Sequence, residues 1–423
     1  MSKLIQRHWT ADGSGFTRKE RLGCDYDAYV PDPLLERSFN FEGEVAATVA
    51  QAEAAILQLN ENATTLLNTE ALARILLRAE AVASSRIEGL VVGVRRLLHE
   101  QVNREMGEKS TDVTAAEIIS NIDAMSMAVD SVRAGDTITL DQILQFHERL
   151  LEGTRLSRHG GQLRQVQNWI GGTEYNPCAA EYVPPPAELV RELMGDLIAF
   201  SSDDVLSPVA QASIAHAQFE TIHPFVDGNG RTGRALIHMI LRRRGLAERV
   251  LTPVSLILAT WSKAYVNGLD GYRYHGSPDS KAAHDGINAW VSQFSIACVR
   301  ACKDATSFEI QAKAFEDEWR EKVGKVRANS ATDLLLKALP GAPVVSVAGA
   351  AKLIGRTFPA ANNAISSLVE AGILKQITVG SRNRAYEAPD IIAAFIGFER
   401  ELSSPAGDTG VSPPSRKVPP RTQ

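Results

Sequence analysis

The amino-acid sequence predicts a mainly α-helical protein with a small β-hairpin in its middle and a separate small domain near its C-terminus. Three observations support this fold class. Apolar residues recur at three- and four-residue spacings through most of the chain, which is the period of an amphipathic helix. Residues 160–186 are instead rich in Gly, Pro, Asn and aromatic residues, as expected for turns around a short hairpin. Residues 331–395 combine short helical patterns with short β-type runs.

The bulk composition is typical of a globular protein with more than one domain. The chain has 423 residues, of which 44% are hydrophobic and 22% are charged, and this length predicts two or three domains. A net charge of -5 argues against wholesale binding to nucleic acid or to a membrane surface. We find no apolar run long enough to cross a bilayer and no signal peptide in residues 1–10, so we expect a cytoplasmic protein.

The four cysteines form no Cys-x-x-Cys pair; they are Cys24, Cys178, Cys298 and Cys302. The last two are four residues apart on an expected helix, where they suit packing as small apolar groups better than metal binding. We expect all four to be reduced thiols, as is usual in a cytoplasm.

The N-terminal region, residues 1–110, is expected to begin with an irregular segment and to continue as helices. Residues 1–40 have no clear period and contain Pro31 and Pro33 near their end, which predicts a loosely packed arm. From residue 42 to about residue 103 the apolar pattern is helical.

The central region, residues 111–304, is expected to place helices on both sides of the Gly- and Pro-rich stretch. Gly245 suits the C-cap of the last of them. The expected helices cover residues 113–132, 139–151, 187–200 and 208–221, and a final one ends near residue 244. Beyond this region, residues 305–330 are charged and helical and are expected to connect to the small domain. Residues 403–423 have little to bury and are expected to be disordered.

The chemistry is concentrated in a stretch that begins at His223 and ends at Arg234, with the sequence HPFVDGNGRTGR. A helix is expected to begin near Arg231, after the turn Asp-Gly-Asn-Gly. Glycine lets a backbone approach a ligand closely, and the unpaired N–H groups at a helix start form an anion site. Arg231 and Arg234 are three residues apart, so both project toward the same anion, and guanidinium groups suit phosphate oxygens.

Each of these residues also has an ordinary structural interpretation. A single loop histidine is most often a hydrogen-bonded or surface residue, and an arginine pair early in a helix is usually solvated. These arginines, however, lie at the positive end of the helix dipole, which is unfavourable unless an anion is present. Asp227 offers Mg²⁺ a hard oxygen ligand, and His223 can accept a proton at neutral pH. We interpret the stretch as a site that holds a nucleotide triphosphate and deprotonates a hydroxyl group beside it.

The stretch resembles the signature of the Fic family, HPFxxGNGRxxR, which it matches in full, and the preceding segment QFETI is also typical of that family. The resemblance implies transfer of AMP from ATP to a protein hydroxyl, with pyrophosphate as the leaving group. It implies that His223 takes the proton of a target Tyr, Ser or Thr and that Asp227 holds Mg²⁺. Relatives that act as kinases carry a lysine in place of Gly230, so this glycine favours attack at the α-phosphorus. The residues implied to contact the ATP phosphates are Gly228, Asn229, Gly230, Arg231 and Arg234.

A second element, Ser84 to Gly89, lies at the end of an expected helix. Ser84 and Glu88 are four residues apart and share a face, which by itself is usually a solvated arrangement. The fragment resembles the inhibitory motif [S/T]xxxE[G/N] of Fic proteins with an N-terminal inhibitory helix. The resemblance implies that Glu88 pairs with Arg234 in the place of the γ-phosphate, so that ATP binds with a misplaced α-phosphate. It equally allows Glu88 to position a water molecule that removes AMP from a modified target.

The Gly- and Pro-rich stretch resembles the hairpin flap of Fic proteins. Such an edge can pair with an extended target loop, but a plain structural hairpin fits the sequence equally well. Tyr265 and Tyr272 are candidates to flank the adenine, although core packing is favoured for at least one of them. His216 is best interpreted as structural.

Residues 331–395 resemble a winged helix-turn-helix domain. This favours a different class of function, a DNA-binding regulator whose Fic domain senses a nucleotide. The expected recognition helix, however, offers Thr357, Asn362, Asn363 and Ser366 and has only Arg356 near its start, with Arg382 and Arg384 in the wing. Because DNA affinity depends heavily on Lys and Arg, protein docking or homodimerisation is favoured over DNA binding.

The sequence therefore predicts a protein adenylyltransferase that uses ATP and Mg²⁺, modifies an unidentified target protein or itself, and is autoinhibited by Glu88. The alternatives left open are removal of AMP, a transferase that uses another nucleotide donor, and the nucleotide-sensing regulator of DNA.

Overall fold

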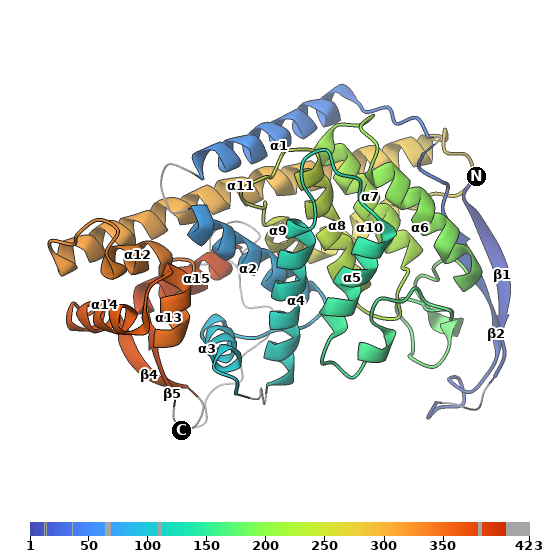
Figure 1. Cartoon of the computed structure of the whole chain (residues 1–423). Helices are drawn as coiled ribbons and strands as arrows, with labels where there is room; N and C mark the ends of the chain where they lie inside the picture. Colours follow the sequence, from blue (N-terminus) through green and yellow to red (C-terminus); the bar gives the residue numbers. More distant parts are fainter. Residues whose placement is uncertain are drawn as a thin grey trace, which may run out of the picture.

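The computed structural model is mainly helical, with two small antiparallel sheets (Figure 1). The structure describes residues 1–11, 13, 15–35, 37–63, 69–108, 112–379 and 383–402. None of the helices within this described part of the chain is both long and apolar enough to cross a membrane. The segment predicted to be disordered, from residue 403 onward, lies outside the described residues, as does Arg382.

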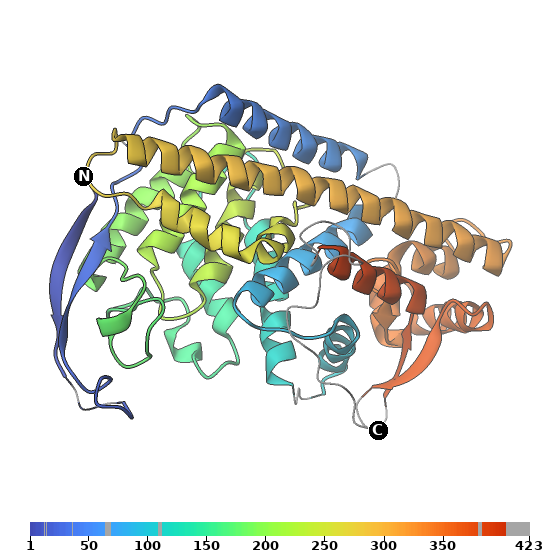
Figure 2. The same cartoon turned by 180° about the vertical axis from the view of Figure 1, so that it is seen from behind.

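The N-terminal segment is a β-hairpin, so the prediction of a loosely packed arm is wrong. Strands β1 (Lys3–Trp9) and β2 (Cys24–Val30) pair antiparallel and run along one side of the helical body (Figures 1 and 2). The end of β2 is buried, and the Tyr29 N–H donates to the Val183 carbonyl at 2.9 Å. Trp9 packs edge-to-face on Trp169, with ring centroids 5.3 Å apart. The hairpin is thus attached to the segment that follows residue 160.

A disulfide bond joins Cys24 of β2 to Cys178, so the prediction of four reduced thiols is wrong for this pair. Cys178 lies in the short helix η2 (Pro177–Ala179), which belongs to the predicted flap. The two remaining cysteines, Cys298 and Cys302, are free and buried, which confirms their predicted role as small apolar groups.

Loss of the Cys24–Cys178 bond should destabilise the protein, because the bond closes a loop across a sequence separation of 154 residues. Cys24→Ser, Cys178→Ser and the double variant should each lower the free energy of unfolding by about 2–5 kcal/mol, measured by denaturant titration under non-reducing conditions. The double variant should match the single ones, since the bond is already absent in each. Unfolding curves that coincide with that of the wild type would contradict this expectation.

Five helices form the first part of the body; α4 and α5 lie close to their predicted bounds, and the region predicted as helical from 42 to 103 contains α1, α2 and α3. In α5, Thr139 and Gln142 form a reciprocal capping box, which fixes where this helix begins. In α4, the Asp112 side chain accepts the Ala115 N–H. The helices are α1 (Gly43–Asn62), α2 (Thr69–Ile87), α3 (Val94–Glu105), α4 (Val113–Asp130) and α5 (Leu140–Leu151).

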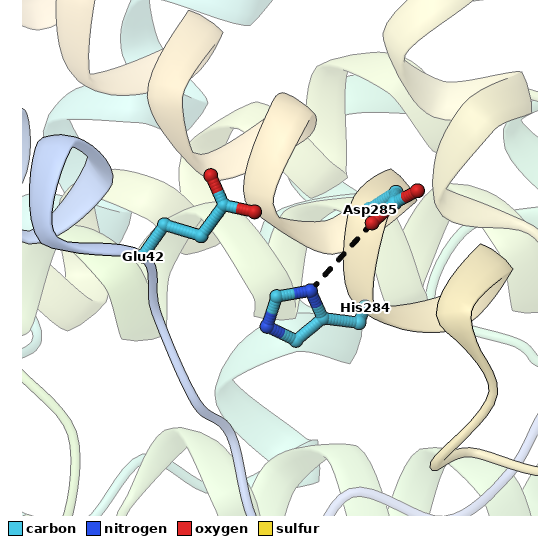
Figure 3. A group of neighbouring side chains, drawn as sticks. All are labelled: Glu42, His284 and Asp285. Atoms are coloured by element: carbon cyan, nitrogen blue, oxygen red, sulfur yellow. Dashed lines mark ion pairs between the residues drawn. The ribbon is translucent and has the colours of Figure 1, made fainter.

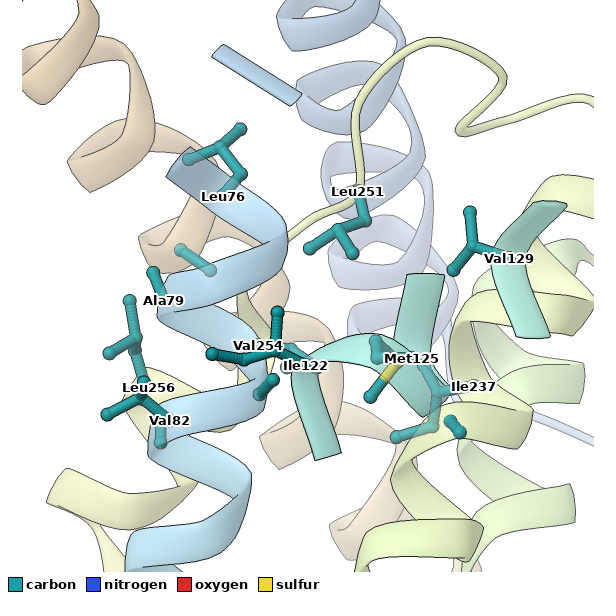
Figure 4. Packing of buried hydrophobic residues seen from close by; sticks show 14 of the residues in the cluster. Leu76, Ala79, Val82, Ile122, Met125, Val129, Ile237, Leu251, Val254 and Leu256 are labelled. Atoms are coloured by element: carbon teal, nitrogen blue, oxygen red, sulfur yellow. The ribbon is translucent and has the colours of Figure 1, made fainter. Parts of the chain in front are cut away.

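The central helices surround a core that also fixes the position of α2. Figure 4 shows side chains of α2, α4, α8 and the segment around α9 packed together, among them Val82, Met125, Ile237 and Leu256. Helices α7 and α8 are buried along nearly their whole lengths. The structure thereby holds the end of α2 against the start of α8. The central helices are α6 (Ala187–Ser201), α7 (Pro208–Ile222), α8 (Asn229–Arg243), α9 (Val254–Thr260), α10 (Ser262–Tyr272) and α11 (Lys281–Val323).

Helix α11 has 43 residues and crosses the whole molecule beside α1 (Figure 2). The segment predicted as a separate connector, residues 305–330, is for the most part the second half of this helix. It buries Phe308, Ala312 and Trp319, so it belongs to the core rather than to a linker. Its apolar residues repeat with the same helical period as the first half, and no helix-ending signal occurs before Gly324.

The C-terminal elements pack against α2 and α3. A side chain on Gly341 would meet the Ala71 backbone at 2.7 Å, so only glycine allows this close approach to α2. Arg95 of α3 pairs with the buried Glu387 at 2.6 Å. The three strands form an antiparallel sheet in the order β3-β5-β4. The elements are α12 (Ala331–Ala338), β3 (Val344–Val345), α13 (Val347–Ile354), α14 (Phe358–Glu370), β4 (Lys375–Val379), β5 (Asn383–Glu387) and α15 (Pro389–Leu402).

Candidate active site

His223 is the C-cap residue that directly follows α7, and its backbone is left-handed, with φ 49° and ψ 61°. This conformation is uncommon for a residue with a Cβ and is held by its surroundings. Its N–H donates to the Phe219 carbonyl at 2.8 Å. Its carbonyl accepts hydrogen bonds from Arg164 Nε at 2.9 Å and from Asn168 Nδ2 at 3.2 Å. The backbone of His223 is thereby fixed at the turn between α7 and the loop that precedes α8.

The His223 imidazole is uncharged at neutral pH. Burial lowers its pKa to about 4; Arg164 and Arg273 add to this effect, while Glu88 opposes it. The side chain keeps 19% of its surface exposed. An uncharged and partly accessible imidazole can accept a proton from an incoming hydroxyl group, as the sequence predicts.

The loop before α8 is shaped by Asn229, whose side-chain oxygen accepts the Phe225 N–H at 2.8 Å and whose amide donates to the Phe225 carbonyl at 2.9 Å. The side-chain oxygen and nitrogen of Asn229 thus both bind the loop itself, a role that the sequence did not indicate. Gly228 has a φ of 77°, and a side chain there would lie 2.9 Å from Leu150, so glycine is required.

Two further residues, which the sequence analysis did not single out, support this loop. His147 Nε2–H donates to the Asp227 carbonyl at 2.9 Å, while its Nδ1 accepts the Gly161 N–H at 3.1 Å. Burial lowers the pKa of His147 to about 4, which keeps it neutral. Arg164 has an exposed fraction of only 2%. Its guanidinium donates to the backbone carbonyl of His223 at the turn and to that of Pro185. His147 belongs to no local motif, whereas Arg164 lies within the stretch that resembles the flap but was not singled out there.

At the start of α8, the Arg231 guanidinium has N–H groups without a hydrogen-bond partner among the described residues. Arg231 is buried, and its Nη2 donates to Asp227 Oδ2 at 3.1 Å. Its Nε and Nη1 have no hydrogen-bond partner among the residues that the structure describes. Buried guanidinium donors are rarely left unsatisfied, so an anion is expected here. The N-cap residue of α8, Gly228, has no side chain that could bind the first N–H groups of the helix, which leaves them for the same anion.

Arg234, one turn further along α8, is bound to the end of α2. Its Nε donates to Ser84 Oγ and its Nη2 to the Ser84 carbonyl, both at 2.8 Å. The same Nη2 donates to Glu88 Oε1 at 2.7 Å. Burial alone would raise the pKa of Glu88, but Arg234, with smaller contributions from Arg231 and His223, outweighs burial and the net shift is downward. Glu88 is therefore a carboxylate at neutral pH.

The Glu88 carboxylate lies directly on the first turn of α8. A Cβ built on Gly230 would overlap Glu88 Oε1, so glycine is the residue that leaves room for this oxygen. The anion position at the helix start is thus held by a side chain of the protein itself.

The way α2 ends explains why a glycine follows Glu88. The Leu90 N–H donates to the Ser85 carbonyl and the Gly89 N–H to the Arg86 carbonyl, which is a Schellman C-cap. Gly89 has a φ of 82°, as this cap requires. The cap turns the chain immediately after Glu88 and leaves its side chain directed at Arg234.

Comparison with known proteins agrees with this geometry. Residues 137–241 match the Fic/DOC family, and residues 46–130 match the N-terminal region of the Fic/DOC family. The chain contains a Fic domain. The loop from His223 to Gly228 and nearly all of α8 lie within the first match, and the Ser84–Gly89 segment lies within the second.

Curated relatives match part of this chain over part of their own length. Protein adenylyltransferase fic-1 of Caenorhabditis elegans is 32% identical over 141 residues, which cover 33% of this chain and 26% of that protein. Protein adenylyltransferase Fic of Drosophila virilis is 38% identical over 111 residues, which cover 26% of this chain and 21% of that protein. The chain spans about a quarter of the length of the curated relatives it matches.

Solved structures of Fic proteins are also similar to this chain. A Fic family protein from Desulfovibrio desulfuricans shows 22% identity and a TM-score of 0.49, and the match covers 83% of this chain and 97% of that one. A fragment of Fic-1 from C. elegans shows 20% identity and a TM-score of 0.45, over 62% of this chain and 73% of that one.

Both tyrosines suggested for adenine binding lie in the hydrophobic core of the protein. The Tyr265 hydroxyl is 2.9 Å from His216 Nε2, and the Tyr272 hydroxyl donates to Gln218 Oε1 at 3.0 Å. Their exposed fractions are 4% and 3%. This burial favours the packing role for both over a place beside the adenine, and it agrees with the structural role predicted for His216.

The predicted flap is present as a minimal hairpin. Ile170 and Tyr182 form a single antiparallel bridge, and the rest of the segment consists of turns. A cavity of about 470 Å³ lies between the flap and the loop from His223 to Gly228, and its lining includes Val166, Trp169 and Val226. This cavity is next to the site in which His223 lies.

A separate group of Glu42, His284 and Asp285 brings three oxygen and nitrogen ligands within 4.8 Å of one another (Figure 3). The two acidic residues are exposed, and Lys281 pairs with Asp285 at 2.6 Å. Because this lysine already neutralises one of the carboxylates, we interpret the group as a charged surface cluster.

Proposed function

We propose that this protein is an adenylyltransferase that moves AMP from ATP to a Tyr, Ser or Thr hydroxyl of a target protein, and that Glu88 keeps this activity low. The observation that carries the proposal is the Glu88 carboxylate seated on the first turn of α8, beside the unpaired donors of Arg231. The names of the relatives, protein adenylyltransferases, agree with it.

The phosphates of ATP would replace Glu88 as the anion at this helix start. Gly228 and Gly230 would offer backbone N–H groups, and Arg231 and Arg234 would offer guanidinium donors. Asn229 would act indirectly, by holding the loop in shape through Phe225.

Asp227 is suited to hold Mg²⁺, because its carboxylate is 47% exposed and lies 3.1 Å from Nη2 of Arg231. A bound Mg²⁺ would supply positive charge that offsets the charge of the phosphates.

His223 would take the proton of the target hydroxyl. A bond then forms between the hydroxyl oxygen and the α-phosphorus, and the bond from that phosphorus to the oxygen bridging to the β-phosphorus breaks. Pyrophosphate leaves with that bridging oxygen, next to Arg231. The chain contributes mainly positioning and charge stabilisation, which is what phosphoryl-type transfer requires.

The position of the label in ATP separates this reaction from a kinase reaction. The Glu88→Gly variant, incubated with a protein extract, should transfer label from ATP labelled in the α-phosphate and none from ATP labelled in the γ-phosphate. Transfer from the γ-label would show a kinase. Loss of label from a previously modified target, faster with the wild-type protein than with the Glu88→Gly variant, would instead favour the removal of AMP. A parallel series with CTP, GTP and UTP identifies the donor.

For the C-terminal elements we propose a winged helix that docks a protein partner, a second copy of this chain included. The order α12-β3-α13-α14-β4-β5 supports the winged-helix assignment. Helix α14 carries no Lys or Arg and exposes 57% of Phe358 and 37% of Val369, which suits a protein contact better than DNA. Full-length protein should therefore leave the mobility of duplex DNA unchanged at low salt, and a salt-dependent shift would favour the DNA-binding regulator.

A further inference from the structure

Helix α7 and the residue at which it ends carry three titratable side chains on one face, His216, Glu220 and His223, at spacings of four and three. Glu220 Oε2 lies 4.0 Å from His223 Nδ1, and Glu220 Oε1 lies 4.0 Å from His216 Nδ1. Glu220 keeps only 7% of its surface exposed and His216 is fully buried. A carboxyl group is thus enclosed between two imidazoles, one of which belongs to the residue proposed as the base.

Three atoms of this group, Glu220 Oε1, His216 Nδ1 and His223 Nδ1, are buried without a hydrogen-bond partner in the described part of the chain. Such atoms are rare in folded proteins. The space around them is tight, because a side chain on Gly233 would come within 2.6 Å of Glu220 Oε1 and 3.1 Å of His216 Nδ1. Helix α8 closes this space, and the unpaired Nδ1 of His223 lies within ion-pair distance of the Glu220 carboxylate.

We propose that Glu220 is a positioning residue for His223, an inference that rests on the proposed transfer reaction. Its carboxylate accepts the Nδ1–H of His223, so that the lone pair of Nε2 faces the target hydroxyl. After His223 has taken the proton, the same carboxylate stabilises the positive charge of the ring. A small rotation of the ring converts the 4.0 Å separation into a hydrogen bond, and such contacts often tighten only when substrate is bound.

The charged groups around Glu220 determine at which pH it can act. Besides the two histidines, Arg234 of α8, Glu88 at the end of α2 and Arg273 after α10 contribute. Burial raises the pKa of Glu220 to about 7, with Arg234 opposing and Glu88 adding to the rise. Glu220 can serve His223 only when it is ionised, so the transfer rate should rise as the pH increases through this pKa.

The test compares Glu220→Gln with its parent in the Glu88→Gly background, in single turnover with α-labelled ATP. The parent should lose activity as the pH falls through the pKa of Glu220, which lies below the wild-type value of about 7 because the charge of Glu88 is absent. Glu220→Gln should be slower by about 10-fold to 100-fold at neutral pH, should lack this loss, and should keep its KM for ATP. Glu220→Asp should recover part of the rate.

His216→Gln is the matched control, because it alters the other neighbour of Glu220 without touching His223. A structural role for Glu220 would make both substitutions lower the rate alike, with the pH profile of the parent retained. That result would overturn the proposal.

Nitrogen NMR of the His223 ring tests the inference without any transfer reaction. Above the pKa of Glu220 the wild-type ring should carry its proton on Nδ1, and this preference should be lost in Glu220→Gln, because the accepting carboxylate is absent. A ring protonated on Nε2 in the wild type would overturn the inference whether or not AMP is transferred. If the NMR result holds and no AMP is transferred, only the proposed function fails.

Discussion

Replacing Glu88 by glycine should raise the rate of AMP transfer by about 10-fold to 100-fold, to a target protein or to the protein itself. The substitution removes the hydrogen bond of 2.7 Å to Arg234 and frees the space above Gly230. Charge-assisted hydrogen bonds of this kind contribute about 1.5–3 kcal/mol, which corresponds to that range of rates. The measurement is the initial rate of label transfer from α-labelled ATP at equal protein concentration.

Two variants at the same contact serve as controls for the Glu88 result. Glu88→Gln keeps the length of the side chain but removes its charge, so its rate should fall between those of the wild type and the glycine variant. Ser84→Ala removes the acceptor of Arg234 Nε, and it should raise the rate less than Glu88→Gly, because the carboxylate stays. Equal rates for all four proteins would contradict autoinhibition by Glu88.

Replacing His223 by alanine in the Glu88→Gly background should lower the transfer rate by about 10²-fold to 10⁴-fold, the range typical of a lost general base. The imidazole is the group that can accept the target's proton, since its pKa of about 4 leaves it neutral at physiological pH. Single-turnover kinetics with α-labelled ATP measure this effect on the chemical step.

ATP binding should survive the loss of His223, because the phosphates are proposed to contact α8 and not the imidazole. Isothermal titration of the variant with ATP checks this. A variant that binds ATP normally and still transfers AMP at the parent rate would rule out His223 as the base. Loss of ATP binding together with activity would instead show that His223 shapes the loop, through its left-handed backbone.

The sequence was sufficient for the features that depend on local pattern. The helical period predicted α4 to α8 to within a few residues and α1 to α3 as one helical region, because each buries one face or nearly all of its surface. The spacing from Ser84 to Glu88 predicted a shared face, and the structure brings both residues to Arg234. The contact of Glu88 with Arg234 joins residues 146 positions apart, and the family resemblance implied it where spacing alone could not.

Features set by long-range packing were not predictable from the sequence. The pairing of β1 with β2 and the bond from Cys24 to Cys178 join segments whose spacing carries no signal. Asn229 is predicted to contact phosphate, and the structure adds a second role, because its side chain closes the loop on Phe225. Tyr265 is buried in contact with His216, a residue on another helix, and this contact carries no signal in the sequence.

Intact-mass spectrometry after incubation with ATP and Mg²⁺ tests the central claim most directly. The proteins to compare are the wild type, Glu88→Gly and Glu88→Gly combined with His223→Ala. The account predicts that the Glu88→Gly protein alone gains the mass of an adenylate. An adenylate on the wild type to the same extent, or on the double variant, would contradict the claim that Glu88 occupies the anion position beside a catalytic His223.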